Sequence, residues 1–154
     1  MILLAILVAA SAPPAEEAAI FQAAGFRKMW NAWHSNCQDA GSPSYQAGAI
    51  ETYRDINHDG RPDAVITEGS TSCYGDTGTR FWLMSKQPDG AWRVVVSEVG
   101  VPEFYKNKGR GGWPNLSVGG PGACFLVYRW NGRAYELYTF EYQGTRCKPP
   151  EGAR

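Results

Sequence analysis

The chain contains 154 residues, in which 15 lysines and arginines balance 15 aspartates and glutamates, so the formal net charge is zero. This length suits one compact domain. The balanced charge and the lack of a long run of like charges argue against the basic stripe that binds a phosphate backbone, so no nucleic-acid partner is expected. The 18 glycines, 10 prolines and 13% aromatic residues are typical of a folded, turn-rich β domain.

An apolar segment opens the chain. Residues 2–10 are all apolar or small, and a Ser-Ala-Pro-Pro sequence ends the run. The run is too short to cross a bilayer, which needs roughly 20 apolar residues, and it matches the core of a secretory signal. We expect residues 1–10 to be a signal peptide cleaved after Ala10, or at a point up to residue 15, leaving a single domain over residues 16–154. A retained N-terminal anchor is the alternative, since no Lys or Arg stands near Met1.

Residues 15–35 carry a helical pattern of apolar side chains. Acidic residues stand in the first turn, and aromatic or sulfur side chains recur at steps of four, three and four: Phe26, Trp30, Trp33 and Cys37. Gly25 interrupts the pattern, so the segment is either one kinked helix or a short helix followed by an extended stretch over residues 29–33. We expect the aromatic stripe to lie in the core.

From residue 41 onward, short β-like runs alternate with Gly, Asp and Asn. The runs cover residues 49–54, 64–68, 80–86, 92–98, 116–118, 124–130 and 133–142. The dipeptides Asp89-Gly90 and Asn131-Gly132 each separate two runs, and such dipeptides supply the positive φ angles of tight hairpins. The sequence therefore predicts a mainly β (α+β) fold, with antiparallel sheets, two such hairpins and an N-terminal helical segment.

The β region contains an internal pseudo-repeat. Residues 60–63 (GRPD) align with residues 112–115 (GWPN), and each is followed by a short strand, a Gly-rich stretch, a cysteine and an aromatic hairpin. This similarity predicts two related sheet units that pack together.

The four cysteines are widely spaced, without a C-x-x-C pair or a histidine at zinc-ligand spacing. In an exported chain, an even number of cysteines predicts disulfides, although four free thiols are the alternative. Of the three possible connectivities we favour Cys37–Cys147 with Cys73–Cys124, because Cys73 and Cys124 occupy nearly equivalent places in the two units.

Residues 55–63 (DINHDGRPD) carry side-chain oxygens at loop positions 1, 3, 5 and 9, with glycine at position 6. Calcium takes about six to eight oxygen ligands, and alternate residues of a tight loop can point inward only where glycine permits the bend. We expect one Ca²⁺ bound by Asp55, Asn57, Asp59, the carbonyl of Arg61, and Asp63. A metal-free turn capped by Asp and Asn is the alternative. Ile66 stands where an EF-hand has glutamate, so the site is predicted between two strands.

Over residues 53–68 this loop resembles the calcium loop of FG-GAP/VCBS-type repeats, the units of the integrin α propeller and of many secreted bacterial proteins. The whole chain is also similar to a group of small exported bacterial proteins that combine such a loop with a GWPD-like segment and a GGPG stretch, here residues 112–115 and 119–122. The resemblance implies calcium binding but no activity. A propeller needs about four blades or more, and this chain has room for two sheet units.

No catalytic constellation emerges from the sequence, so we expect a protein that is not an enzyme. His34 and His58 belong to no nucleophile or metal motif. A carboxylate pair drawn from Glu51, Glu68 and Glu98 would indicate a carbohydrate-active enzyme, which stays an alternative.

Binding through exposed aromatic rings is a further class of function. Tyr74, Tyr105 and Trp113 lie in Gly-rich loops, where exposed rings would contact a glycan or a protein. A structural envelope protein without a ligand is another alternative. We therefore expect a periplasmic or secreted, calcium-binding monomer with a protein or glycan partner and no transmembrane segment in its mature form.

Overall fold

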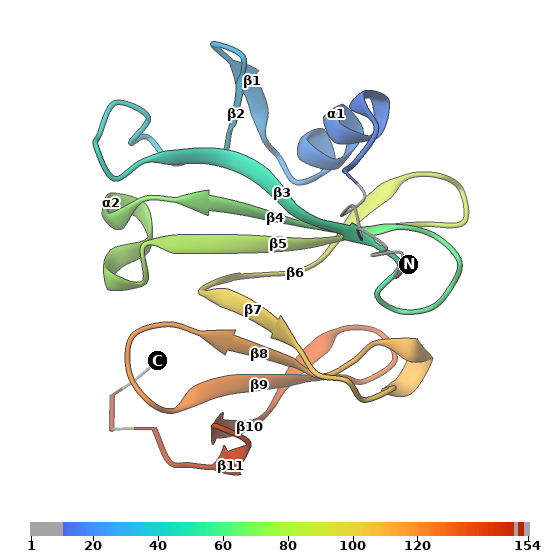
Figure 1. Ribbon diagram of the computed structural model, residues 1–154, viewed down its shortest axis with the longest axis vertical. Helices are drawn as coiled ribbons and strands as arrows, with labels where there is room; N and C mark the ends of the chain where they lie inside the picture. The colour runs from blue at the N-terminus through green and yellow to red at the C-terminus, as the bar shows by residue number, and fades with distance from the viewer. Residues whose placement is uncertain (1–10, 150, 153–154) are drawn as a thin grey trace, which may run out of the picture.

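The computed structural model describes residues 11–149 and 151–152 and shows two antiparallel sheets with a short helix near the N-terminus (Figure 1). The mainly β fold expected from the sequence is confirmed. The predicted signal peptide, residues 1–10, lies outside the described residues. Among the helices of the described ranges, none is long and apolar enough to cross a bilayer.

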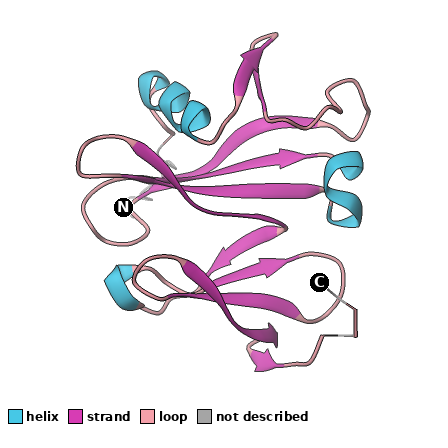
Figure 2. Ribbon diagram, turned by 180° about the vertical axis from the view of Figure 1, so that it is seen from behind, coloured by secondary structure: helices cyan, strands magenta, loops and turns pink. Residues whose placement is uncertain are grey.

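The first sheet has six strands in chain order, and the second has five in the order β11-β10-β9-β8-β7. The first comprises β1 (Arg27–Met29), β2 (Ala32–His34), β3 (Gln46–Arg54), β4 (Asp63–Gly69), β5 (Thr79–Lys86) and β6 (Trp92–Val99). The second comprises β7 (Val101–Phe104), β8 (Leu116–Gly119), β9 (Phe125–Trp130), β10 (Tyr135–Tyr142) and β11 (Thr145–Arg146). The helical segments are α1 (Pro14–Ala23), α2 (Thr71–Tyr74) and the 3₁₀ turns η1 (Gly75–Thr77) and η2 (Arg110–Gly112) (Figure 2).

The two predicted units are present as two four-stranded antiparallel meanders, β3 to β6 and β7 to β10. Both predicted hairpins form, because Gly90 and Gly132 adopt φ angles of 86° and 107° in the turns after β5 and β9. Gly100 alone separates β6 from β7, so one residue connects the units.

Strands β4 and β5 are buried on both faces, which explains their nearly continuous apolar sequence. Ile66 and Met84 face α1 and the β1–β2 hairpin, where Phe21 completes the core. On the other face, Val65 and Leu83 pack against residues of the second sheet: Leu116 and Val118, together with Trp113 of the preceding loop. Each fully buried side chain of this size contributes about 1.5–3 kcal/mol. The loop of residues 55–62 therefore leads directly into β4, one of these two well-buried strands.

The structure of the N-terminal segment differs from the helical stripe that the sequence predicted. Helix α1 ends at Ala23, and the chain then forms the β1–β2 hairpin, whose turn residues Trp30 and Asn31 have φ angles of 48° and 63°. Trp30 is 84% exposed, so placing it in the core was wrong, whereas Phe26 and Trp33 are buried as predicted. Of the two alternatives, the short helix followed by an extended segment is observed. Positive φ angles at both central residues are those of a type I′ hairpin turn, which places Trp30 at the tip.

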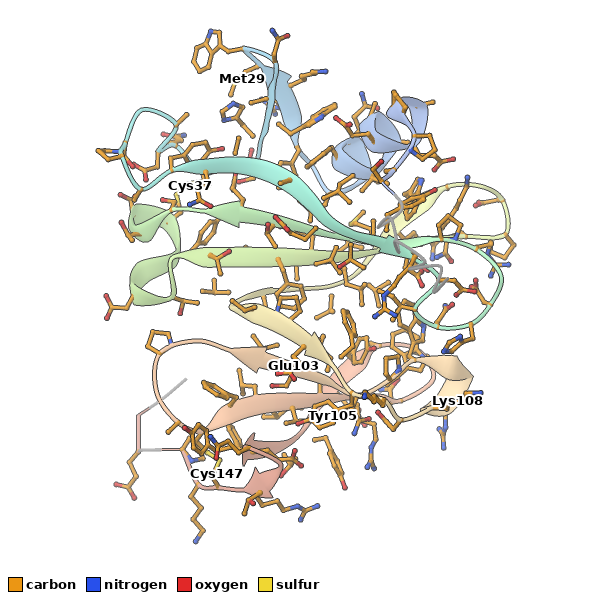
Figure 3. The ribbon with its side chains drawn as sticks, viewed as in Figure 1. Met29, Cys37, Glu103, Tyr105, Lys108 and Cys147 are labelled. Atoms are coloured by element: carbon orange, nitrogen blue, oxygen red, sulfur yellow. A yellow bond between two sulfur atoms is a disulfide. The ribbon has the colours of Figure 1, made fainter. Side chains whose placement is uncertain are left out.

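The disulfides also differ from the prediction. All four cysteines are bonded, but the pairs are Cys37–Cys73 and Cys124–Cys147, so the predicted pairing of Cys37 with Cys147 and of Cys73 with Cys124 was wrong. Cys37 lies beside the first sheet and Cys147 beside the second (Figure 3). Stacked sheets lie about 10 Å apart, whereas the Cα atoms of a disulfide lie about 4.4–6.8 Å apart. Equivalent places in the repeat therefore do not by themselves bring two cysteines within bridging distance.

Candidate functional site

The loop of residues 55–62 joins β3 to β4, and Asp63 is the first residue of β4. The buried side chain of Ile56 anchors the loop in the core that the two sheets share. His58 and Gly60 adopt φ angles of 60° and 85°, so the backbone reverses sharply at its tip. The loop is thus a strand-loop-strand connection, as predicted.

The side-chain oxygens of the loop accept backbone N–H groups from across the turn. The two carboxylate oxygens of Asp55 accept from the N–H groups of Asp59 (3.2 Å) and Gly60 (2.8 Å). The side-chain oxygen of Asn57 also accepts from the N–H of Asp59, at 3.1 Å. These bonds draw the oxygens at positions 1 and 3 toward the same part of the loop.

Asp63 is a fully buried carboxylate at the base of the loop. Its Oδ2 accepts from the backbone N–H groups of Ile56 (2.8 Å) and Asn57 (3.3 Å). Its Oδ1 is buried and has no hydrogen-bond partner among the described residues. Burial is the main cause that raises the pKa of Asp63. The nearby hydroxyl of Ser85, on the neighbouring strand β5, and the two N–H groups oppose it, but this hydroxyl is not placed to donate a hydrogen bond to Oδ1. A buried carboxylate oxygen without a donor is a group that a cation would satisfy.

A competing contact involves Asp59. Nη2 of Arg61 lies 2.6 Å from Oδ2 of Asp59, and Nε of Arg61 donates to the carbonyl of Lys86 at 3.0 Å. In the part of the chain that the structure describes, no three Asp, Glu, His or Cys side chains converge as metal ligands. The predicted set also draws on the amide of Asn57 and the carbonyl of Arg61. Calcium would have to compete with the guanidinium of Arg61 for Asp59.

Two of the three predicted aromatic ligand residues are buried instead of exposed. Tyr74 is 9% exposed and donates to the carboxylate of Glu68, while Trp113 is 5% exposed and lies in the core between the sheets. Their Gly-rich loops fold back onto the sheets, so the predicted exposed rings were wrong at these positions. Tyr105, labelled in Figure 3, is half-buried and donates to Glu141 at 2.8 Å. It lines a cavity of about 540 Å³.

The three glutamates considered as a catalytic pair are separated. Glu68 is buried on the face toward the β1–β2 hairpin. Glu98 lies on the opposite face and accepts from Tyr128 at 3.3 Å, and Glu51 accepts from Thr67 at 3.2 Å. No two of these carboxylates share a hydrogen-bond partner within the described residues.

A cleft of about 290 Å³ beside the loop was not predicted. It is lined by residues of the loop, β5, β6, β9 and the loops before β8 and after β9, which include Asp59, Arg61, Arg93, Val94, Trp130 and Arg133. These residues come from distant parts of the chain, so no local sequence pattern could have indicated the cleft.

The likeness of the loop to FG-GAP/VCBS repeats rests on residues 53–68, and it stays a prediction. The loop connects two antiparallel strands, which agrees with a strand-loop-strand site. No protein-family description, curated protein or solved structure matches the chain, so comparison with known proteins assigns it to no family.

Proposed function

We propose that residues 55–63 bind one Ca²⁺ and that the chain is an exported, calcium-stabilised β domain with a binding role. The observation that carries this proposal is the buried Oδ1 of Asp63 at the base of the loop, which accepts no hydrogen bond from any residue that the structure describes. The proposed ligands are the side chains of Asp55, Asn57, Asp59 and Asp63 and the carbonyl of Arg61. When bound, a divalent cation neutralises the carboxylates and satisfies the buried oxygen.

Export is supported by the two disulfides, because such bonds persist in oxidising compartments outside the cytoplasm. The apolar residues 2–10 give the same indication from the sequence. We therefore propose that the mature domain works in the periplasm or the extracellular medium, where calcium sites with dissociation constants of about 10⁻⁴–10⁻³ M are common.

Bound calcium would hold the end of β3 against the start of β4, because Asp55 follows the first strand and Asp63 opens the second. A ligand that binds only the folded state stabilises it by mass action, by about 2.7 kcal/mol at a hundredfold excess over the dissociation constant. The predicted effect of calcium is thus a higher unfolding temperature.

The experiment is calorimetric titration of the chelator-treated protein with CaCl₂, together with thermal unfolding in calcium and in chelator. We expect saturable binding of one ion, a higher midpoint in calcium, and loss of both effects in Asp55→Asn. Asp89→Asn is the matched control, since Asp89 precedes Gly90 in another tight turn and accepts from the N–H of Ala91. Equal midpoints and no heat at millimolar calcium would reject the proposal, as would equal losses in the two variants.

A further inference from the structure

The cleft beside the loop is lined by three arginines from separate parts of the chain. Arg61 belongs to the loop, Arg93 to β6 and Arg133 to the turn after β9. Asp59 is the acidic residue among the described residues that line this cleft, and its carboxylate is paired with Arg61. The cleft therefore carries net positive charge, although the whole chain is formally neutral.

Two of these arginines are free to bind an anion. Arg93 and Arg133 are exposed, and within the described ranges their guanidinium groups form no hydrogen bond or ion pair. Arg61, in contrast, is held by Asp59 and by the carbonyl of Lys86. Guanidinium groups bind carboxylates through two parallel N–H donors, so unpaired arginines beside a cleft favour an anionic ligand.

The walls of the cleft are aromatic and apolar. Trp130 is half-buried, and its ring centroid lies 5.7 Å from that of Trp113 and 5.4 Å from that of Tyr135, so its orientation is fixed by packing. Val94 is 44% exposed at the same cleft. Ring faces and aliphatic side chains contact the C–H surfaces of a sugar. The volume of about 290 Å³ is at the lower end of ligand pockets and suits a single ring.

A neighbouring cleft extends the positive surface. It has a volume of about 350 Å³, shares Trp130 with the first cleft, and is lined by three basic residues, Lys108, Arg110 and Arg129, and one acidic residue, Glu136. Figure 3 shows Lys108 on the loop that follows β7. Two clefts that share Trp130 and each carry basic residues suit a chain of repeating acidic units better than a single small anion.

We propose that this pair of clefts binds an acidic oligosaccharide, with one uronate ring against Trp130 and its carboxylate between Arg93 and Arg133. The arginines supply the charge, so this binding does not require calcium at residues 55–63. The proposal thus names acidic oligosaccharides as a ligand class of the domain, in addition to the calcium ion proposed at the loop.

The test is an NMR titration that follows the indole N–H of Trp130, assigned with Trp130→Phe. The probes are trigalacturonate and its neutral methyl ester, which differ in charge but share the ring. We expect a saturable shift with the acid and none with the ester. The double variant Arg93→Gln/Arg133→Gln should raise the dissociation constant at least about tenfold. Arg27→Gln, which removes an exposed charge from β1, should leave it unchanged.

Several outcomes would overturn the proposal. Equal binding of the ester would remove the role of the arginines, and an equal loss in Arg27→Gln would show a nonspecific charge effect. Equal affinity for sulfate or for a tri-aspartate peptide would assign the cleft to anions in general or to an acidic peptide. Titrations in calcium and in chelator separate this result from the metal proposal, because binding in chelator that depends on Arg93 and Arg133 supports the cleft whatever calorimetry shows for calcium.

Discussion

The backbone carbonyl of Asn57 lies directly against Gly112, so that a Cβ atom placed on Gly112 would stand 1.9 Å from the carbonyl oxygen. Asn57 belongs to the loop before β4, and Gly112 belongs to η2 in the loop before β8. These are the two loops that the sequence repeat aligns, so corresponding parts of the two units touch. The contact holds the candidate calcium loop against the second sheet.

This contact predicts a large effect for Gly112→Ala. The substitution adds a clash with Asn57 to the strain of a positive φ angle of 80°, so we expect the free energy of unfolding to fall by more than about 2 kcal/mol. Gly90→Ala is the matched control, because Gly90 has a φ of 86° with nothing within 4 Å of its added Cβ, and should cost about 1–2 kcal/mol. Urea unfolding of both variants measures the difference, and equal losses would contradict the contact.

The hydrogen bonds of Glu68 lead to a second prediction, that Glu68→Gln lowers the free energy of unfolding. Its buried carboxylate accepts from the backbone N–H of Ser35 at 3.0 Å, from the hydroxyl of Tyr45 at 2.7 Å, and from the hydroxyls of Ser35 and Tyr74. In Glu68→Gln an amide N–H₂ replaces one acceptor, so we expect a loss of about 1–3 kcal/mol in chemical unfolding. Glu51→Gln at an exposed position should change stability by less than about 0.5 kcal/mol. A comparable effect in both variants would argue against the network.

Tyrosine hydroxyls predict a fall in stability at high pH. Burial and nearby glutamates raise the pKa of Tyr74 and of Tyr128 to about 12, from the ordinary value of 10.0. The unfolded chain therefore loses these protons first, so their contribution is complete below about pH 10 and is lost as the pH rises toward about 12. Urea midpoints should decline over this range, and less steeply in Tyr128→Phe. A constant midpoint between about pH 9 and 11 would exclude the effect.

In the hairpin between β1 and β2, we expect substitution of one tryptophan to reduce stability strongly and substitution of the other to leave it nearly unchanged. Trp33 is 7% exposed, and its Nε1 donates to Glu17 at 2.9 Å, so Trp33→Ala should cost about 3–5 kcal/mol. Trp30 is 84% exposed, so Trp30→Ser should change stability by less than about 0.5 kcal/mol. Thermal unfolding checks both, and a large loss for Trp30→Ser would place that ring in a core.

The disulfide pairing predicts the products of proteolysis. Digestion without reduction, followed by mass spectrometry, should find peptides that join Cys37 to Cys73 and Cys124 to Cys147. The double variant Cys124→Ser/Cys147→Ser should lose about 3 kcal/mol, as expected for a closed loop with a sequence separation of 23. A peptide that joins Cys37 to Cys147 would disprove the pairing.

Local sequence signals predicted much of the sheet structure. Asp89-Gly90 and Asn131-Gly132 placed both hairpins correctly, because their turn geometry depends on two adjacent residues. The β1–β2 hairpin was missed because its turn is Trp30-Asn31, a pair without a usual turn residue at its first position. Aromatic spacing of three and four residues then resembled a helix.

The remaining features depend on how the two units pack, which the sequence does not show directly. Disulfide pairing was wrong because equivalence in the repeat does not bring Cys73 and Cys124 close together in space. The oxygens of the loop could be identified from spacing, but the burial of Asp63 depends on the second sheet. The arginine cleft combines residues 61, 93 and 133, so only the folded chain brings it together.

Cys37–Cys73 lies entirely before Gly100 in the chain and Cys124–Cys147 entirely after it, and Gly100 is the single residue between β6 and β7. Cutting the backbone at Gly100 would consequently yield two fragments with no covalent link, even under oxidising conditions. Their reassociation would depend on the apolar surface that Val65 and Leu83 share with Leu116 and Val118. The domain could thus be made as two separate chains, each with its own disulfide, whose affinity for each other would measure the strength of the interface between the sheets.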